Sequence, residues 1–240
     1  MANVQTVAAP ARPVGVISTS IGMKLLMAVT GTVFILFVIG HLIGNLQVFI
    51  GQEAVNHYAE FLKGLGSLLW IERVLMALFF IVHIWMGIKL WLQNRSARPV
   101  AYAHQDTVQA SVSSRTMIYS GLVILLYVIY HLLHFTLVVT NPEYSGLHDS
   151  LGRFDVYSMV VIGFRNAWIS GIYIIAMIVL GFHLNHAVES LFQTFGLNNQ
   201  TWRKRYELLG AVIGIGVAVG YISIPVAVLT GCVTLPGGGY

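Results

Sequence analysis

The sequence is poor in charged residues and contains a single cysteine. Charged residues make up 9% of its 240 residues, whereas soluble domains contain roughly 25%. Because Cys232 is the only cysteine, we expect no internal disulfide and no iron–sulfur cluster held by this chain alone. The 13 basic residues are spread thinly, which argues against nucleic-acid binding. Residues 1–20 lack a basic segment followed by an apolar run, so we expect no cleavable signal peptide.

Long apolar runs dominate the rest of the chain. The sequence is 57% apolar with a mean hydropathy of +0.77, and about 20 apolar residues can cross a bilayer as a helix. Five such runs lie at about 24–46, 71–93, 117–139, 168–190 and 208–230. They lack the charged faces that a soluble helical core would need. The sequence therefore predicts an all-α membrane protein with five transmembrane helices. We expect one domain over residues 21–240, after a flexible or surface-lying arm over residues 1–20.

The distribution of basic residues predicts the orientation of the spans. With the N-terminus in the cytoplasm, nine of the 13 basic residues lie inside and four outside. The inner nine are Arg12, Lys24, Lys89, Arg95, Arg98, Arg115, Arg203, Lys204 and Arg205. The outer four are Lys63, Arg73, Arg153 and Arg165. Five spans then put the C-terminus outside.

The segments between the spans carry predictions of their own. After the first span, apolar side chains recur at helical spacing and predict an amphipathic helix on the outer surface. They are Ala54, Tyr58, Phe61, Leu62 and Leu65. Loop 94–116 is polar and basic and predicts an inner docking surface, and loop 141–163 is expected outside. The fifth span has no histidine, while its glycines favour close helix packing and Pro225 predicts a kink.

Four spans each carry a histidine inside an apolar run: His41, His83, His131 and His183. The bilayer core has no water to bond an imidazole ring, so an unpartnered ring there is costly. One explanation covers all four, namely two b-type haems that are each held between two histidines. Such cofactors lie between the facing helices of a four-helix bundle. We therefore predict that four of the five spans form a haem-binding bundle.

The depths of these histidines sort them into two pairs. Counted from the span midpoints at ~1.5 Å per residue, His41 lies about 9 Å and His131 about 4–5 Å toward the outside. His83 lies about 1.5 Å and His183 about 6 Å toward the inside. The outer pair is thus His41 with His131, and the inner pair is His83 with His183. The mean depths of the two pairs differ by roughly 10 Å.

Two further histidines leave the ligand choice open. His134 and His186 each follow a candidate ligand by three residues, and depth alone does not decide between the neighbours. Membrane histidines also bond adjacent helices or line proton paths, which is the alternative for a haem-free transporter. A metal-transport site would need carboxylates at the same depth, and the central spans contain none.

A haem site has further requirements. Each ligand should bind iron through Nε2 and donate its Nδ1–H to a carbonyl or hydroxyl group. Gly40 and Gly44 flank His41 and allow either a porphyrin or a second helix to approach. Candidate partners of the haem propionates are Arg73 and Arg165 outside, and Lys24, Lys89 and Arg115 inside. Candidate quinone contacts, which must donate hydrogen bonds or protons, are His57, Glu60 and Glu72 outside, and Ser20, Lys24 and Trp202 inside.

With five spans and these histidines, the sequence resembles the cytochrome b558 membrane anchor of succinate:quinone oxidoreductase, or respiratory complex II. The resemblance is to the single-subunit, dihaem form, which some fumarate reductases share. The matching stretches are TGTVFILFVIGHLIGN, FFIVHIWMGIKLW with NRSARPVAY after it, YHLLHF, and GFHLNHAVESLFQTFGL. Together they cover about residues 18–210.

The resemblance implies a ligand set and cofactors. In that family the first and third spans bind the distal haem b, which corresponds here to His41 and His131. The second and fourth spans bind the proximal haem b, which corresponds to His83 and His183. The resemblance therefore favours the first histidine of each neighbouring pair. It also implies a quinone, with menaquinone as the expected type.

The resemblance implies partners and a location as well. An FAD-containing flavoprotein subunit would oxidise succinate, and an iron–sulfur subunit would pass the electrons to this chain. The chain would be the membrane subunit of an enzyme of electron transport and the tricarboxylic acid cycle. Its place would be the inner (cytoplasmic) membrane of a bacterial cell, in contact with lipid and in a complex that can form a higher oligomer.

Two alternatives and one departure remain. The complex could run as a fumarate reductase, or the chain could be the haem b subunit of a hydrogenase or formate dehydrogenase. In some dihaem fumarate reductases a glutamate two residues before the fourth-span ligand is tied to transmembrane proton movement. That position is Gly181 here, which speaks against this proton route.

Overall fold

The protein is described by a computed structural model that covers residues 15, 19–97 and 112–237. Within this part the chain is all-helical, and five helices are long and apolar enough to cross a membrane. They are α1 (Ser20–Leu46), α3 (Ser67–Ser96), α5 (Met117–His131), α7 (Ala167–Thr194) and α8 (Gln200–Leu229). The predicted all-α class with five long apolar helices that could cross a membrane is thereby confirmed. Most of the arm over residues 1–20 and of loop 94–116 lies outside the described residues.

The ends of the long helices follow local capping chemistry more than hydropathy. Helix α1 begins at Ser20 because the Thr19 side chain accepts a hydrogen bond from the Gly22 backbone N–H. Helix α8 begins at Gln200, well before the apolar run, and Asn199 caps it in the same way. Helix α5 ends earlier than expected, at His131, and continues as a π-helical turn, η3 (Leu132–Thr136).

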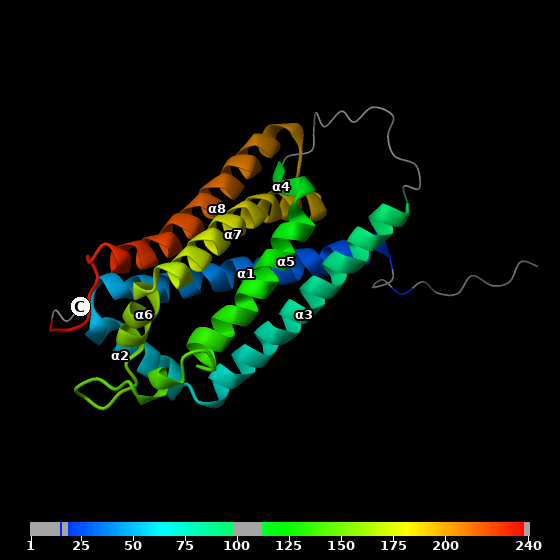
Figure 1. Cartoon of the computed structure of the whole chain (residues 1–240). Coiled ribbons are helices and arrows are strands. Elements are labelled where there is room, and N and C mark those ends of the chain that lie inside the picture. The colour runs from blue at the N-terminus through cyan, green and yellow to red at the C-terminus, as the bar shows by residue number, and fades with distance from the viewer. Residues whose placement is uncertain (1–14, 16–18, 98–111, 238–240) are drawn as a thin grey trace, which may run out of the picture.

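Helices α7 and α8 pack closely along most of their length (Figure 1). Glycines make this approach possible, because a Cβ on Gly214 would collide with the Gly181 carbonyl oxygen. A Cβ on Gly210 would lie 2.5 Å from the Asn185 carbonyl oxygen. The fifth span thus packs as its glycines predicted.

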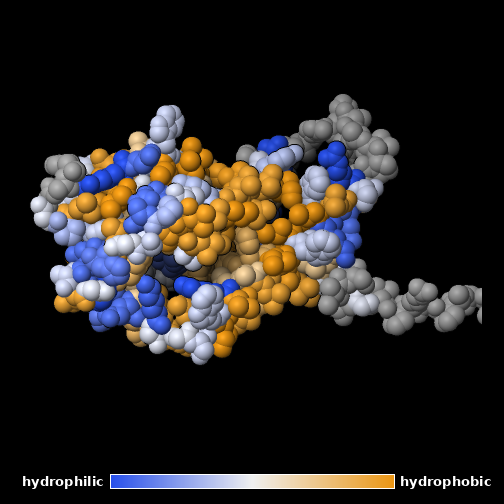
Figure 2. Space-filling model, turned by 60° about the horizontal axis from the view of Figure 1, so that its bottom comes forward, coloured by the Kyte–Doolittle hydropathy of each residue, from blue (hydrophilic) through white to orange (hydrophobic). Residues whose placement is uncertain are grey.

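Helix α3 lies at the other edge of the molecule (Figure 1), where α1 is its main neighbour and α5 touches it less. Its outer side chains are apolar and exposed, including Trp70, Leu78 and Trp85. Figure 2 shows a broad hydrophobic surface on this molecule, which separates hydrophilic regions at the two ends. A surface of this kind suits lipid contact rather than water.

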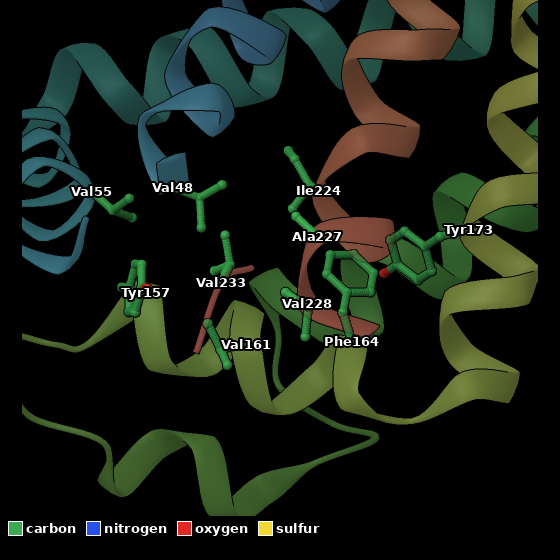
Figure 3. Packing of buried hydrophobic residues seen from close by; sticks show 10 residues of the cluster. All are labelled: Val48, Val55, Tyr157, Val161, Phe164, Tyr173, Ile224, Ala227, Val228 and Val233. Atoms are coloured by element: carbon green, nitrogen blue, oxygen red, sulfur yellow. The ribbon is translucent and has the colours of Figure 1, made fainter. Parts of the chain in front are cut away.

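Short helices close one end of the bundle, which we call the α2 end. They are η2 (Gln47–Phe49), α2 (Gln52–Gly64), η4 (Pro142–Gly146) and α6 (Val156–Arg165). Segment 141–163 was expected to be an outer loop, but most of α6 lies in it. Tyr157, Val161 and Phe164 of α6 are buried in one cluster with residues of η2, α2 and α8 (Figure 3). A helix of ten residues is too short to register as a span, which is why hydropathy missed it.

A network of polar side chains, here called the polar cap, fastens α2 to the segment before α6. Its members are Gln52, Glu53, Asn56, Asp149, Arg153 and Asp155. Asn56 is buried, and its side-chain nitrogen donates to Asp149 (3.1 Å) and to Asp155 (3.0 Å). Arg153 pairs with Glu53 (2.6 Å) and Asp149 (2.8 Å). Because Asn56 is part of the cap, α2 buries the side of Val55 and Asn56, while Phe61 of the expected apolar face stays 58% exposed.

The polar cap predicts a loss of stability in acid. Burial opposes the ionisation of Asp149, but hydrogen bonds from Arg153, Asn56 and backbone N–H groups lower its pKa to about 2. A carboxyl group with a depressed pKa stabilises the fold fully above its unfolded pKa of about 3.9, and this contribution disappears as the pH falls toward the folded value. The melting temperature in detergent should therefore change little from pH 8 to 5 and fall between about pH 4 and 2. Asp149→Asn should lower the melting temperature at neutral pH and reduce its fall between about pH 4 and 2. A fall in acid as large as that of the wild type would contradict this assignment.

Candidate cofactor site

The four span histidines come from four different helices, and all four are only partly buried. His41 lies in α1, His83 in α3 and His183 in α7, while His131 is the last residue of α5. His131 therefore directly precedes the π-helical turn, a distortion that is frequent at functional sites. The four rings belong to the helices that surround the middle of the bundle.

His41 and His131 lie side by side. Their ring centroids are 6.0 Å apart with the planes at 82°. Two imidazoles on opposite sides of one metal, each bonded at about 2 Å, have centroids about 6 Å apart. Aromatic rings flank the pair, with Phe37 at 5.5 Å from His41 and Tyr127 at 5.8 Å from His131. The residues present thus fit a bis-histidine haem at this position.

The second pair, His83 and His183, is fixed by hydroxyl groups from neighbouring helices. The Thr30 oxygen lies 2.9 Å from His83 Nδ1, and the Ser120 oxygen lies 2.9 Å from His183 Nδ1. Each ring therefore has a hydrogen-bond partner at Nδ1.

The hydroxyl contacts allow the tautomer of these two rings that binds a metal. The Thr30 hydroxyl also lies 2.8 Å from the Leu26 carbonyl, and the Ser120 hydroxyl lies 3.0 Å from the Met117 carbonyl. A hydroxyl that donates to its carbonyl can only accept from the histidine, and in that arrangement Nδ1 carries the proton. The Nε2 atoms of His83 and His183 would then keep their lone pairs, which is the state that binds a metal.

Glycines stand next to both hydroxyl residues. A Cβ on Gly31 would lie 3.6 Å from His83 Cε1, and a Cβ on Gly121 would lie 3.7 Å from His183 Cε1. Around His41, a Cβ on Gly40 would meet nothing within 4 Å, whereas one on Gly44 would collide with the Tyr58 ring at 2.6 Å. Gly40 therefore leaves open space, and Gly44 serves the packing of α2 on α1.

His134 has different surroundings from His131. Its side chain is fully buried, and its Nδ1 lies 3.0 Å from the Tyr173 hydroxyl. The rings of Tyr130, Phe135, Tyr144 and Tyr173 all have centroids within 6 Å of its own. It is His131, not His134, that has a ring contact with His41 among the described residues. The local packing thus supplies a distinction that depth could not.

His186 differs from His183 in a comparable way. Its Nδ1 is buried and has no hydrogen-bond partner among the described residues, whereas His183 Nδ1 is bonded to Ser120. The same residues contain no cluster of three or more His, Cys, Asp or Glu side chains that could enclose a metal ion. The one ring contact between two of the four span histidines among the described residues is the His41–His131 pair.

Four of the five expected propionate partners lie near the ends of their helices. The guanidinium of Arg73 lies 5.2 Å from the Trp70 ring centroid at the start of α3. Arg165 ends α6, Lys24 is in the first turns of α1, and Arg115 ends the short helix α4 (Val112–Arg115). All four are exposed at the ends of the bundle, and Lys89 of α3 is partly buried.

The expected quinone contacts are likewise peripheral. Glu60 lies 3.9 Å from Arg153 at the edge of the polar cap, His57 is exposed, and Glu72 is partly exposed on α3. At the opposite end, Ser20 and Lys24 are exposed on α1, and Trp202 stacks with Tyr206 at 5.9 Å. No hydrogen bond or ion pair among the described residues joins the members of either group.

Sequence reasoning missed several residues that shape the site. Thr30 and Ser120 are hydrogen-bonded to His83 and His183. Tyr173 contacts both His131 and His134. The ring centroid of Tyr221 in α8 lies 6.2 Å from that of His41. One signal was present, because a hydroxyl residue precedes glycine in both Thr30–Gly31 and Ser120–Gly121. The tyrosines gave no signal, since their roles depend on contacts across helices.

Comparison with known proteins adds no relative. Neither the family models, nor the curated proteins, nor the solved structures contain a match to this chain.

Proposed function

We propose that this chain is the dihaem cytochrome b membrane anchor of a succinate:quinone oxidoreductase. In this role it carries electrons between an iron–sulfur partner and a membrane quinone. The observation that supports it best is the contact between His41 and His131, whose ring centroids are 6.0 Å apart. For His83 and His183, the support is that each Nδ1 atom is hydrogen-bonded to a hydroxyl.

The chain's own residues would hold and insulate the cofactors. His41 with His131, and His83 with His183, would hold two haems b. A bound haem supplies one-electron redox chemistry. The hydroxyls of Thr30 and Ser120 keep Nε2 available and make the imidazoles better donors. The apolar helices exclude water, which keeps the region low in dielectric.

Partners and orientation belong to the proposal. The basic residues favour a cytoplasmic N-terminus and a flavoprotein and iron–sulfur subunit docked on that side. Menaquinone is the proposed acceptor in a bacterial cytoplasmic membrane. At Gly181 a glutamate would have little room, since even a Cβ would lie 3.0 Å from the Gly214 carbonyl oxygen. This close packing supports a complex without a proton route at that position.

The complex isolated from its native membrane tests the proposal. Succinate should reduce its b haems, and an added menaquinone analogue should reoxidise them, as followed by the haem absorbance bands. Co-purification of flavoprotein and iron–sulfur subunits is the expected composition. Reduction by formate or hydrogen, but not by succinate, would assign the chain to another membrane oxidoreductase and overturn the proposal.

The hydroxyl bonds at the inner pair give a further prediction. Thr30→Val removes the acceptor of the His83 Nδ1–H and leaves a donor unsatisfied, at a cost of ~1–3 kcal/mol. Loss of such an outer partner typically weakens metal binding by about 10–100-fold. One of the two haems should bind more weakly, as haem titration of the apoprotein would measure. Thr32→Val is the matched control, since within the described residues the Thr32 hydroxyl bonds only the Ala28 carbonyl. An equal effect of both changes would contradict the assignment.

A further inference from the structure

The Tyr173 hydroxyl lies between two histidines of the same chain segment. It is 3.0 Å from His134 Nδ1 and 3.5 Å from His131 Nδ1. Tyr173 is 5% exposed and His134 is fully buried. The remaining ring nitrogen of His134, Nε2, is also buried and has no hydrogen-bond partner among the described residues. The three side chains therefore form a short chain in which Tyr173 and His134 are buried and His131 is partly buried.

Donor counting limits what this chain can do. A phenol has one hydrogen to donate and can accept another in return. Tyr173 can thus donate to one histidine and accept from the other. The two directions differ in which nitrogen of His131 carries the proton. In one direction His131 Nε2 has a free lone pair, and in the other it is protonated and cannot bind a metal.

We propose that Tyr173 and His134 are positioning residues that hold His131 in its metal-binding tautomer. This inference rests on the proposed function, since it takes His131 as a haem ligand. With its Nε2 bound to a metal, His131 would donate its Nδ1–H to the Tyr173 hydroxyl, and Tyr173 would in turn donate to His134 Nδ1. His134 then carries its proton on Nε2. This chain of hydrogen bonds thus gives a role to both the buried Tyr173 hydroxyl and the buried His134 ring.

The two histidine pairs consequently differ in how their ligands are supported. At the inner pair the hydrogen bonds run through Thr30 and Ser120 to main-chain carbonyls. At His131 they run through a phenol to a second imidazole. A hydrogen bond at Nδ1 increases the electron donation of the ligand and favours ferric iron. Tyr173 and His134 therefore set the potential of one haem without touching the other.

A redox titration of the purified holoprotein tests this assignment. Tyr173→Phe should keep two haems and raise the midpoint potential of only one. His134→Leu should produce a shift in the same direction, because Tyr173 loses its acceptor. His134→Gln should restore most of the wild-type potential, because its amide oxygen can accept from the phenol.

Tyr127→Phe is the matched control. The Tyr127 ring centroid lies 5.8 Å from that of His131 and 5.2 Å from that of Tyr173. Within the described residues, the Tyr127 hydroxyl makes no hydrogen bond to a histidine. Its removal should move neither potential. Unmoved potentials in Tyr173→Phe, equal shifts of both haems, or no difference between His134→Gln and His134→Leu would overturn the positioning role. Those results would leave the proposed function intact, whereas a wild-type protein without haem would overturn both. If Tyr173→Phe fails to fold, the midpoint potentials of His134→Leu and His134→Gln test the positioning role instead.

Discussion

Replacing His131 with alanine is expected to halve the haem content, from two haems b per chain to one, whereas His134→Ala should retain both. The two residues lie three positions apart, but only His131 has its ring beside that of His41, at a centroid distance of 6.0 Å. Haem held by two imidazoles loses an axial ligand when one is removed. His134 instead bonds Tyr173 in a buried aromatic environment. Quantitative haem extraction on the purified variants measures the difference.

The comparison has an internal check at the inner pair. His183→Ala should remove the other haem and leave the outer one, because the two pairs use separate ligands. Circular dichroism should show the same helical content in all three variants. Loss of haem in His134→Ala with retention in His131→Ala would reverse the ligand assignment. Loss of both haems in every variant would contradict the separation into two pairs.

Replacing Gly214 with leucine is expected to separate α7 from α8 and to destabilise the chain strongly. A Cβ at this position would collide with the Gly181 carbonyl oxygen of the facing helix, and backbone cannot move aside as a flexible side chain can. Overpacking typically costs ~1–3 kcal/mol and sometimes more. Because α7 carries His183, we expect a lower melting temperature in detergent and weaker haem binding.

Gly216→Leu on the same helix is the matched control. Like Gly214→Leu, it replaces a glycine with leucine, but a Cβ at Gly216 would meet nothing within 4 Å. Its melting temperature should therefore stay near that of the wild type. Similar melting temperatures for the two variants would show that the α7–α8 contact contributes little to stability.

The spans and their histidines could be predicted because each depends on a short stretch of sequence. An apolar run of about 20 residues identifies a membrane helix wherever it occurs, and depth along a helix follows from ~1.5 Å per residue. The predicted pairing of His41 with His131 needed only these two quantities, and the structure puts their rings side by side.

The rest of the site depends on contacts between helices, which sequence periodicity does not specify. Thr30 and His83 are hydrogen-bonded although they lie 53 positions apart in the sequence, and Ser120 and His183 lie 63 positions apart. Helix α6 was missed because its apolar run is short. The choice between His131 and His134 depends on the direction in which each side chain points from the helix. The π-helical turn after α5 changes that direction for the residues that follow.

The number of haems per chain tests the central claim most directly. A pyridine haemochrome assay on the purified chain, set against its protein content from amino-acid analysis, gives this number without assumptions about partners. Four histidines in two pairs predict two haems b per chain. A chain that is folded and membrane-inserted but binds fewer than two would contradict the dihaem assignment, and one that binds none would favour a haem-free transporter.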